Sequence, residues 1–191
     1  MEAKKKAPAD RRVQKTRMAL RDALIGLILE RGWDETNVQD LCDRANVGRS
    51  TFYTHFADKE ELLIGGLGDL RKALRQLAPA AAGAQPLAFA RGIIEHAQEQ
   101  RRLFRALLGK RSGHVVQQRF RDLLLGLVKE DLAALVPSGP QLDAATHYIA
   151  GAFFELLIWW VDSRSPIPTA DLEELFHRMT TPVVGTLPGR R

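Results

Sequence analysis

The side chains best suited to bind a ligand lie close together, in a stretch short enough to be a single helix. They are Arg49, Ser50, Thr51, Tyr53, Thr54 and His55. Almost every one of them can donate a hydrogen bond to a phosphate oxygen or to the edge of a base. Surface helices usually carry both signs of charge, and this one carries no acid. The composition therefore favours nucleic-acid binding over a merely solvated surface.

Two short helices joined by a tight turn must position these side chains. The first helix begins at Asn37, which has the capping-box spacing to Asp40. It ends at Asn46, a residue type that tolerates left-handed backbone, and the second helix follows from Arg49. The small and apolar residues shared by the two helices are Leu41, Cys42, Ala45, Val47 and Phe52. This pattern predicts a helix-turn-helix, in which the outer face of the second helix is free to bind.

Longer helices flank this pair. Upstream, apolar residues recur with helical spacing between about residues 14 and 31. Gly32 then stands where a left-handed residue closes a helix. Downstream, Asp58 and Glu61 form a second capping box, which opens a helix to about residue 77.

Three glycines interrupt this downstream helix, at positions 65, 66 and 68. Each of them destabilises a helix by about 0.8–1 kcal/mol relative to alanine. One explanation is close packing against the upstream helix, or simply a tolerated weakness. The other is a soft point that lets the two ends of the chain move relative to each other.

The rest of the chain also has helical periodicity. Residues 79–85, rich in alanine, are typical of a linker, and Pro86 suits the first position of a new helix. The further helices are predicted over residues 86–100, 103–108, 113–135, 142–162 and 169–187. With no convincing strand, we expect an all-α fold of about nine helices.

The positive charge of the chain is concentrated at its start. Residues 1–17 hold seven basic and two acidic side chains, a net charge of +5. All 191 residues together also have a net charge of +5, so the rest of the chain is neutral overall. Residues 1–13 are therefore expected to be a basic flexible arm. Such an arm on a neutral body is typical of a protein with a polyanionic partner, although a solubilising tail explains this feature equally well.

Six short pieces of sequence follow one another between residues 16 and 63. They are Thr16-Arg17, Glu30-Arg31-Gly32-Trp33, Thr36-Asn37-Val38, Ala45-Asn46-Val47-Gly48, Thr51-Phe52-Tyr53-Thr54-His55-Phe56 and Asp58-Lys59-Glu60-Glu61-Leu62-Leu63. In these pieces the chain resembles the TetR family of bacterial transcriptional repressors. The resemblance implies a DNA-binding domain at residues 14–57, a connector helix at 58–78, and a domain for effector binding and dimerisation at 79–191.

The resemblance also implies roles for individual residues. Those placed in the DNA groove would be Arg49, Ser50, Thr51 and Thr54. Tyr53 and Lys59 would bind phosphate, and Asn37 would present a helix N-terminus to another phosphate. Two residues depart from the family pattern, which usually has glycine in place of Asn46 and serine in place of Gly48. The second change removes a hydroxyl that could touch DNA.

Aromatic residues are concentrated in the second half of the chain. They are expected to be mainly plain core or dimer interface, but a helical bundle with this many rings could also enclose an apolar cavity. The candidate cavity residues are Phe89, Phe104, Phe120, Phe154 and Trp159. The helix at 142–162 is apolar around more than half of its circumference, which predicts packing against a second copy. The candidate dimer residues are Phe153, Leu157, Trp160 and Leu175.

The second half is also divided by charge. Residues 91–121 carry a net charge of +6 and residues 122–191 a net charge of −4. Charge matching within or between chains explains this division. A pocket for an amphiphile with an acidic head is the alternative.

Other functions lack a pattern in the sequence. The five histidines show no metal-ligand spacing, so no metal or other cofactor is expected, and no nucleophile motif indicates an enzyme. A single cysteine excludes an internal disulfide and favours a reducing compartment. No signal peptide is predicted, and the longest apolar run, residues 149–161, is too short to span a bilayer.

These observations predict a homodimeric repressor in the bacterial cytoplasm, associated with the nucleoid. It would bind a palindromic double-stranded DNA operator and be released by an apolar or amphiphilic small molecule. The alternative is a helical interaction protein whose helix-turn-helix is vestigial or docks protein.

Overall fold

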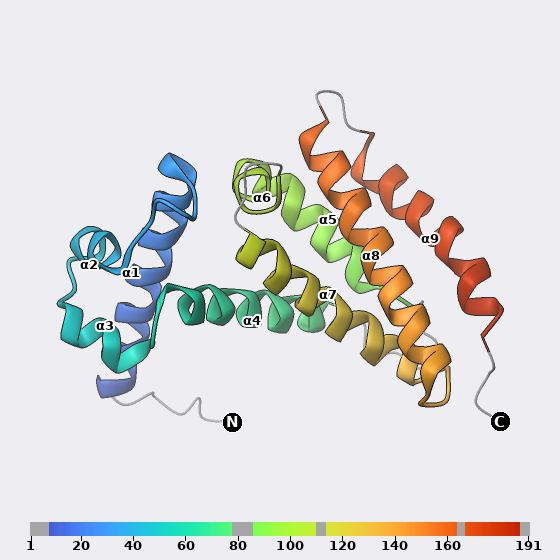
Figure 1. The fold of residues 1–191 in the computed structure, drawn as a ribbon, viewed down its shortest axis with the longest axis horizontal. Helices are drawn as coiled ribbons and strands as arrows, with labels where there is room; N and C mark the ends of the chain where they lie inside the picture. The colour runs from blue at the N-terminus through green and yellow to red at the C-terminus, as the bar shows by residue number, and fades with distance from the viewer. Residues whose placement is uncertain (1–7, 78–85, 110–113, 164–166, 188–191) are drawn as a thin grey trace, which may run out of the picture. The chain divides into compact units, whose positions relative to one another are not determined.

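The computed structural model describes residues 8–77, 86–109, 114–163 and 167–187. These residues form α-helices and no strand, which confirms the predicted all-α class (Figure 1). In chain order the helices are α1 (Pro8–Arg31), α2 (Val38–Ala45), α3 (Arg49–His55), α4 (Lys59–Leu77), α5 (Phe89–Glu99), α6 (Arg101–Leu108), α7 (His114–Ala133), α8 (Pro140–Asp162) and α9 (Thr169–Gly185).

The chain divides into two units, and the division falls inside α4. The first unit comprises Met1–Gly66 and the second Leu67–Arg191. The predicted connector helix at 58–78 thus belongs to both units. The division coincides with the run of glycines in α4.

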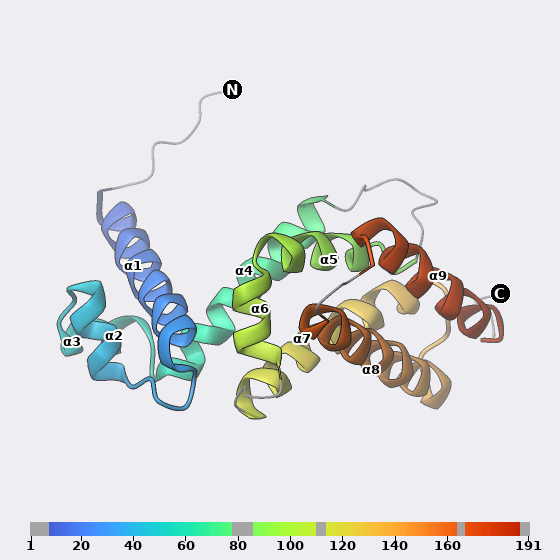
Figure 2. The same cartoon turned by 90° about the horizontal axis from the view of Figure 1, so that it is seen from above.

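In the first unit, α2 and α3 lie on the same side of α1 in both views (Figures 1 and 2). Because apolar residues recur with helical spacing on α1, one stripe of its side chains is buried, and α1 packs against α2. The buried residues of α1 are Leu20, Ala23, Leu24, Leu27 and Ile28. The helix then ends as predicted, because Gly32 has φ +88° and its N–H donates to the Ile28 carbonyl at 2.9 Å.

The start of α1 differs from the prediction. The helix begins at Pro8 and not near residue 14, so residues 8–13 of the predicted arm are helical. Proline suits a first helical turn, and the alanine, arginine and glutamine that follow favour helix. Residues 1–7 of the arm lie outside the described residues.

The second unit is built around α8, which packs against α7 on one side and α9 on another. Its core contains a series of ring contacts, with Phe153 between Phe89 and Phe176 at centroid distances of 5.7 and 4.8 Å. By length and composition α8 could cross a membrane, but half of that apolar segment is buried inside the protein. This burial is typical of a core helix.

The start of α5 also corrects the sequence prediction. Pro86 does not begin the helix, because Leu87 has a left-handed φ of +65° and α5 begins only at Phe89. The Leu87 side chain is buried, and its N–H donates to the Asp131 carboxylate at 2.9 Å. A distant acid on α7 therefore stabilises a turn that local propensity disfavours.

Candidate DNA-binding surface

The α2–α3 corner has the geometry that the sequence predicts. The Asp40 N–H donates to the Asn37 side chain at 3.1 Å, and the Asn37 N–H donates to the Asp40 carboxylate at 3.2 Å. At the other end of α2, Asn46 has φ +52° and ψ +49°. Val47 then donates its N–H to the Cys42 carbonyl at 2.9 Å. The capping box and the left-handed turn are both confirmed.

A small apolar core fixes the angle between the two helices. Leu41, Cys42, Phe52 and Phe56 are buried, and the rings of Phe52 and Phe56 lie 5.9 Å apart. Burial raises the pKa of the Cys42 thiol, which suits a core residue better than a reactive one. With this face of α3 buried, its opposite face must point outward.

The outward face of α3 carries the predicted donors. The exposed side chains are Arg49, Ser50, Thr51, Tyr53 and Thr54. Arg49 lies over the Tyr53 ring at 6.0 Å, and a hydrogen bond to Tyr53 raises the pKa of Arg49. The Thr54 hydroxyl donates to the Ser50 carbonyl at 2.9 Å, which leaves its oxygen as an acceptor. His55 is half-buried beside Phe56, at the edge of this surface.

Basic residues also lie along the start of α1. Arg11, Arg12 and Lys15 are exposed there. Arg17 contacts the C-terminal end of α3, since its guanidinium lies 4.7 Å from the centre of the Phe56 ring. The first unit thus combines an acid-free helix face with a cationic α1.

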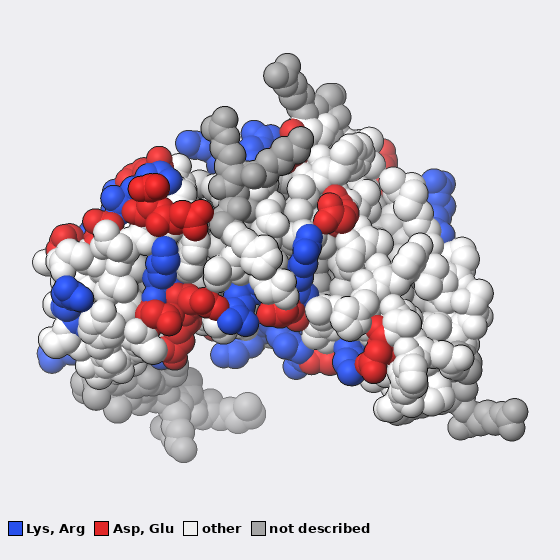
Figure 3. Space-filling model, viewed as in Figure 1, with Lys and Arg blue, Asp and Glu red and all other residues white. Residues whose placement is uncertain are grey.

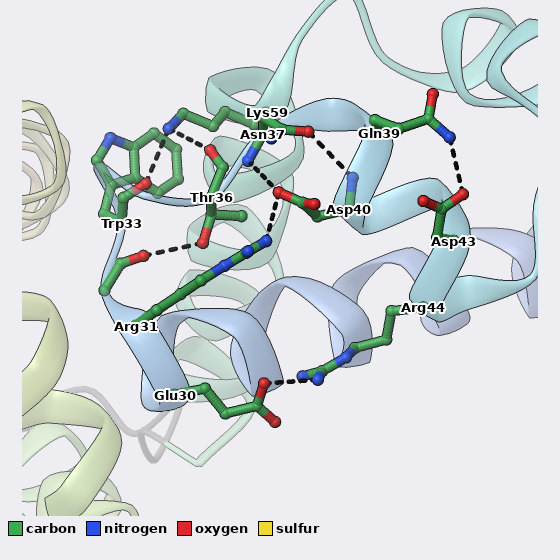
Figure 4. A network of polar contacts seen from close by, with 11 residues as sticks. Glu30, Arg31, Trp33, Thr36, Asn37, Gln39, Asp40, Asp43, Arg44 and Lys59 are labelled. Carbon is green, nitrogen blue, oxygen red and sulfur yellow. Dashed lines mark hydrogen bonds and ion pairs between the residues drawn. The ribbon is translucent and has the colours of Figure 1, made fainter.

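A polar network joins the α1–α2 turn to the first residue of α4 (Figure 4). The Lys59 ammonium donates to the carbonyls of Trp33 and Thr36, at 2.8 and 2.7 Å. Arg31 pairs with the Asp40 carboxylate. Sequence reasoning assigned Lys59 to phosphate and overlooked these bonds, because its partners lie 23 and 26 residues away.

In the second unit, the predicted cavity residues are not all together. Phe89, Phe104, Phe120 and Phe154 are buried core residues, whereas Trp159 is 54% exposed and does not belong with them. The Phe104 and Phe120 rings lie 5.9 Å apart, and those of Phe120 and Phe154 6.3 Å apart.

The predicted dimer residues require a larger correction. Phe153, Leu157 and Trp160 are buried within a single copy of the chain, so a second copy cannot reach them. Because α8 is apolar on several sides, its sequence did not distinguish the core face from the outer face. Leu175 on α9 is only partly buried. The large exposed apolar side chains of α8 and α9 are Tyr148, Trp159 and Met179.

Some charges of the second unit are paired within the chain. Arg105 lies 3.7 Å from Asp162, and Arg121 lies 3.2 Å from Glu155. On the face seen in Figure 3, Lys and Arg side chains stand next to Asp and Glu side chains. These pairs join the basic and acidic halves that the sequence distinguished. Among the described residues, no group of three or more potential ligands could hold a metal ion.

Two family models match the chain. The model of the tetR family of bacterial regulatory proteins matches residues 20–65, and a model of a transcriptional regulator C-terminal region matches residues 85–182. Together they cover the helix-turn-helix and most of the second unit. The chain belongs to the TetR family of bacterial regulators.

Individual relatives agree with this assignment. The uncharacterized HTH-type regulator YxbF of Bacillus subtilis (strain 168) is 40% identical over 63 residues, which is 32% of this chain and 17% of YxbF. The HTH-type regulator TcmR of Streptomyces glaucescens is 29% identical over 133 residues, or 64% of this chain and 54% of TcmR. The aligned regions thus span only 17% and 54% of these two relatives.

A solved structure matches over nearly the full length. The TetR transcriptional regulator from Streptococcus agalactiae 2603V has a TM-score of 0.68 and 29% sequence identity. The match covers 90% of this chain and 97% of that one. The likeness therefore extends through both units and is not confined to the helix-turn-helix.

Proposed function

We propose that this chain is a sequence-specific DNA-binding repressor that acts as a homodimer and is released from its operator by a small molecule. The observation that carries the proposal is the outward face of α3, which presents five exposed polar side chains and no acid. That face stands on a capped helix-turn-helix, and such a helix fits the major groove of DNA. The cytoplasm of a bacterium is the compartment in which this activity would operate.

DNA binding is tested by selecting duplexes from a randomised pool and measuring affinity against salt concentration. A repressor of this kind should select a palindrome with half-sites about one helical turn apart, or somewhat more. The logarithm of affinity should fall linearly with the logarithm of salt concentration. Absence of salt-dependent duplex binding would instead support a helical interaction protein.

Dimerisation is proposed through the outer faces of α8 and α9. Tyr148 and Trp159 are 62% and 54% exposed on α8, and Met179 is 61% exposed on α9. Large exposed apolar side chains on neighbouring helices are typical of an interface. Leu175, four residues before Met179 on α9, is partly buried and is included in the proposed interface. Analytical ultracentrifugation should show a dimer that Trp159→Ala weakens, whereas Lys72→Ala, at an exposed polar site of the same unit, should have no effect.

The effector is proposed to be apolar or amphiphilic, because the core of the second unit is rich in aromatic rings. A thermal-shift panel of fatty acids, acyl-coenzyme A thioesters and neutral drugs tests its class. Preferential stabilisation by the anionic members would support an acidic head group. If neutral members raise the melting temperature equally, the acidic head group is rejected. The internal pairs of Arg105 and Arg121 then explain the division of charge.

A further inference from the structure

The Lys59 ammonium makes several contacts within the protein. Two of its three ammonium hydrogens are directed to the carbonyls of Trp33 and Thr36. The ammonium also lies 4.4 Å from the centre of the Trp33 ring, a cation–π distance. The side chain is half-buried, and this burial lowers the pKa of Lys59. Protein groups thus replace part of the water around this charge.

The carbonyls that Lys59 binds belong to the turn between α1 and α2. Thr36 is buried, and its hydroxyl donates to the Gly32 carbonyl at 2.8 Å. Asn37, the next residue, caps α2. The Trp33 carbonyl also accepts the Thr36 N–H at 3.1 Å, so the Thr36 carbonyl is the one that depends more on Lys59. A peptide carbonyl that loses its donor inside such a turn is costly to leave unpaired. Lys59 therefore fixes the point at which α2 begins.

The position of α2 determines the position of α3. The two helices share the buried residues Leu41 and Phe52 and are joined by the left-handed turn at Asn46. A shift of the α1–α2 turn would move α2, and α3 would move with it. A displacement of about an ångström is enough to misalign hydrogen bonds to base edges.

From these contacts we infer that Lys59 is a positioning residue: it holds the α1–α2 turn so that α3 is presented correctly, and it is not a phosphate ligand. The inference rests on the proposed DNA-binding function. It differs from the role that family resemblance implies for this lysine. The two roles predict different salt dependence, because only a phosphate contact releases counterions.

The first experiment compares Lys59→Met with Lys72→Met on the selected duplex. Lys72→Met removes the same charge from an exposed site of the second unit and controls for the change in net charge. Lys59→Met should weaken binding about tenfold or more, the equivalent of one hydrogen bond from a charged group. Its salt slope should equal that of Lys72→Met and of the wild type. A slope of log affinity against log salt that is smaller than the wild-type slope by about 0.9 would indicate one lost phosphate contact and would overturn the inference.

A second measurement needs no DNA. Nitrogen-15 NMR of the free protein resolves three indole signals, from Trp33, Trp159 and Trp160. Lys59→Met should shift the Trp33 indole and the amides of residues 33–40, while the other two indoles stay in place. Lys59→Arg should restore both the spectrum and the affinity, since guanidinium can bind two carbonyls and stack on an aromatic ring.

The outcomes separate the two proposals. An unchanged Trp33 signal in a folded Lys59→Met protein would reject the positioning role. If Lys59→Met unfolds the first unit, Lys59→Gln decides, because its amide can still donate to a carbonyl but carries no charge for a phosphate. A native spectrum with the wild-type salt slope supports the inference, and a native spectrum with a slope smaller by about 0.9 overturns it. Failure of the wild type to bind any duplex would reject the proposed function, while the NMR shifts would still establish the turn contact.

Discussion

Helices α3 and α8 expose surfaces of different character. Each exposes a tyrosine, Tyr53 on α3 and Tyr148 on α8. The other exposed side chains of α3 are polar, whereas α8 also exposes the indole of Trp159. A face that binds a polyanion needs donors in water, whereas a face that binds protein gains from burying apolar area. The two surfaces are therefore suited to different partners.

The two units also differ in how their helices are stabilised. In the first unit, a capping box at the start of α2 and a left-handed glycine at the end of α1 satisfy helix ends with residues only three or four positions away. The predicted capping box of α4 is half formed, because the Glu61 N–H donates to Asp58 at 2.8 Å but the Glu61 carboxylate accepts from Ala57. In the second unit, Arg101 and Arg105 of α6 bind the carbonyls of Trp160 and Val161 at the end of α8. Those partners are separated by 59 and 56 residues. Local pairs are visible in a sequence, and distant ones are not.

The largest expected effect separates the core of α8 from its surface. Phe153→Ala should lower the free energy of unfolding by about 3–5 kcal/mol, because it empties a site between two other rings. Urea unfolding at two protein concentrations measures this change. Trp159→Ala should instead act mainly on the dimer dissociation constant. If Phe153→Ala instead weakened the dimer without lowering the free energy of unfolding, Phe153 would belong to the dimer interface.

The outer face of α3 gives the next effect. Arg49→Ala should cost about 1–3 kcal/mol of binding free energy, mainly on the cognate duplex, because arginine can reach base edges. Fluorescence anisotropy with cognate and random duplexes measures it. Lys15→Ala, which removes an exposed charge from α1, should weaken both duplexes equally if it contacts phosphate. Equal losses for Arg49→Ala on both duplexes would contradict base reading by this residue.

The glycines of α4 test how the two units are coupled. A Cβ at Gly65 would lie 3.8 Å from the Phe56 ring, one at Gly66 would lie 3.9 Å from Arg21, and one at Gly68 would meet nothing within 4 Å. Packing therefore does not require glycine, and alanine should stabilise the helix by about 0.8–1 kcal/mol per site.

If this segment is a hinge, Gly65→Ala/Gly66→Ala should raise the melting temperature and also reduce the change in DNA affinity caused by effector. Thermal unfolding and anisotropy with the strongest ligand of the panel measure the two effects. A stabilised variant with an unaltered effector response would reject the hinge.

The smallest effect concerns His177 of α9. Burial lowers the pKa of this imidazole, although Glu173, 4.0 Å away, opposes the shift. The folded state then binds a proton less readily than the unfolded state, so the stabilisation is complete above about pH 6.5 and is lost as pH falls below it. As the pH is lowered below about 6.5, the melting temperature should fall less for His177→Gln than for the wild type. The matched control is His147→Gln, which removes an exposed imidazole from α8 and should keep the wild-type trend.

The sequence by itself determined the elements whose signals are local. Asn37, Asn46 and Gly32 each act on backbone within a few residues, so the ends of α1 and α2 and the exposed face of α3 followed from residue type and spacing. The start of α1 was missed because its first two turns lack an apolar stripe.

Only the tertiary structure decided which side of α8 is core, since that helix is apolar on several sides and its pattern fits more than one orientation. It also decided the partners of Lys59 and Leu87. Their bonds join residues more than 20 positions apart, and such pairs form only when the packing of helices brings them together.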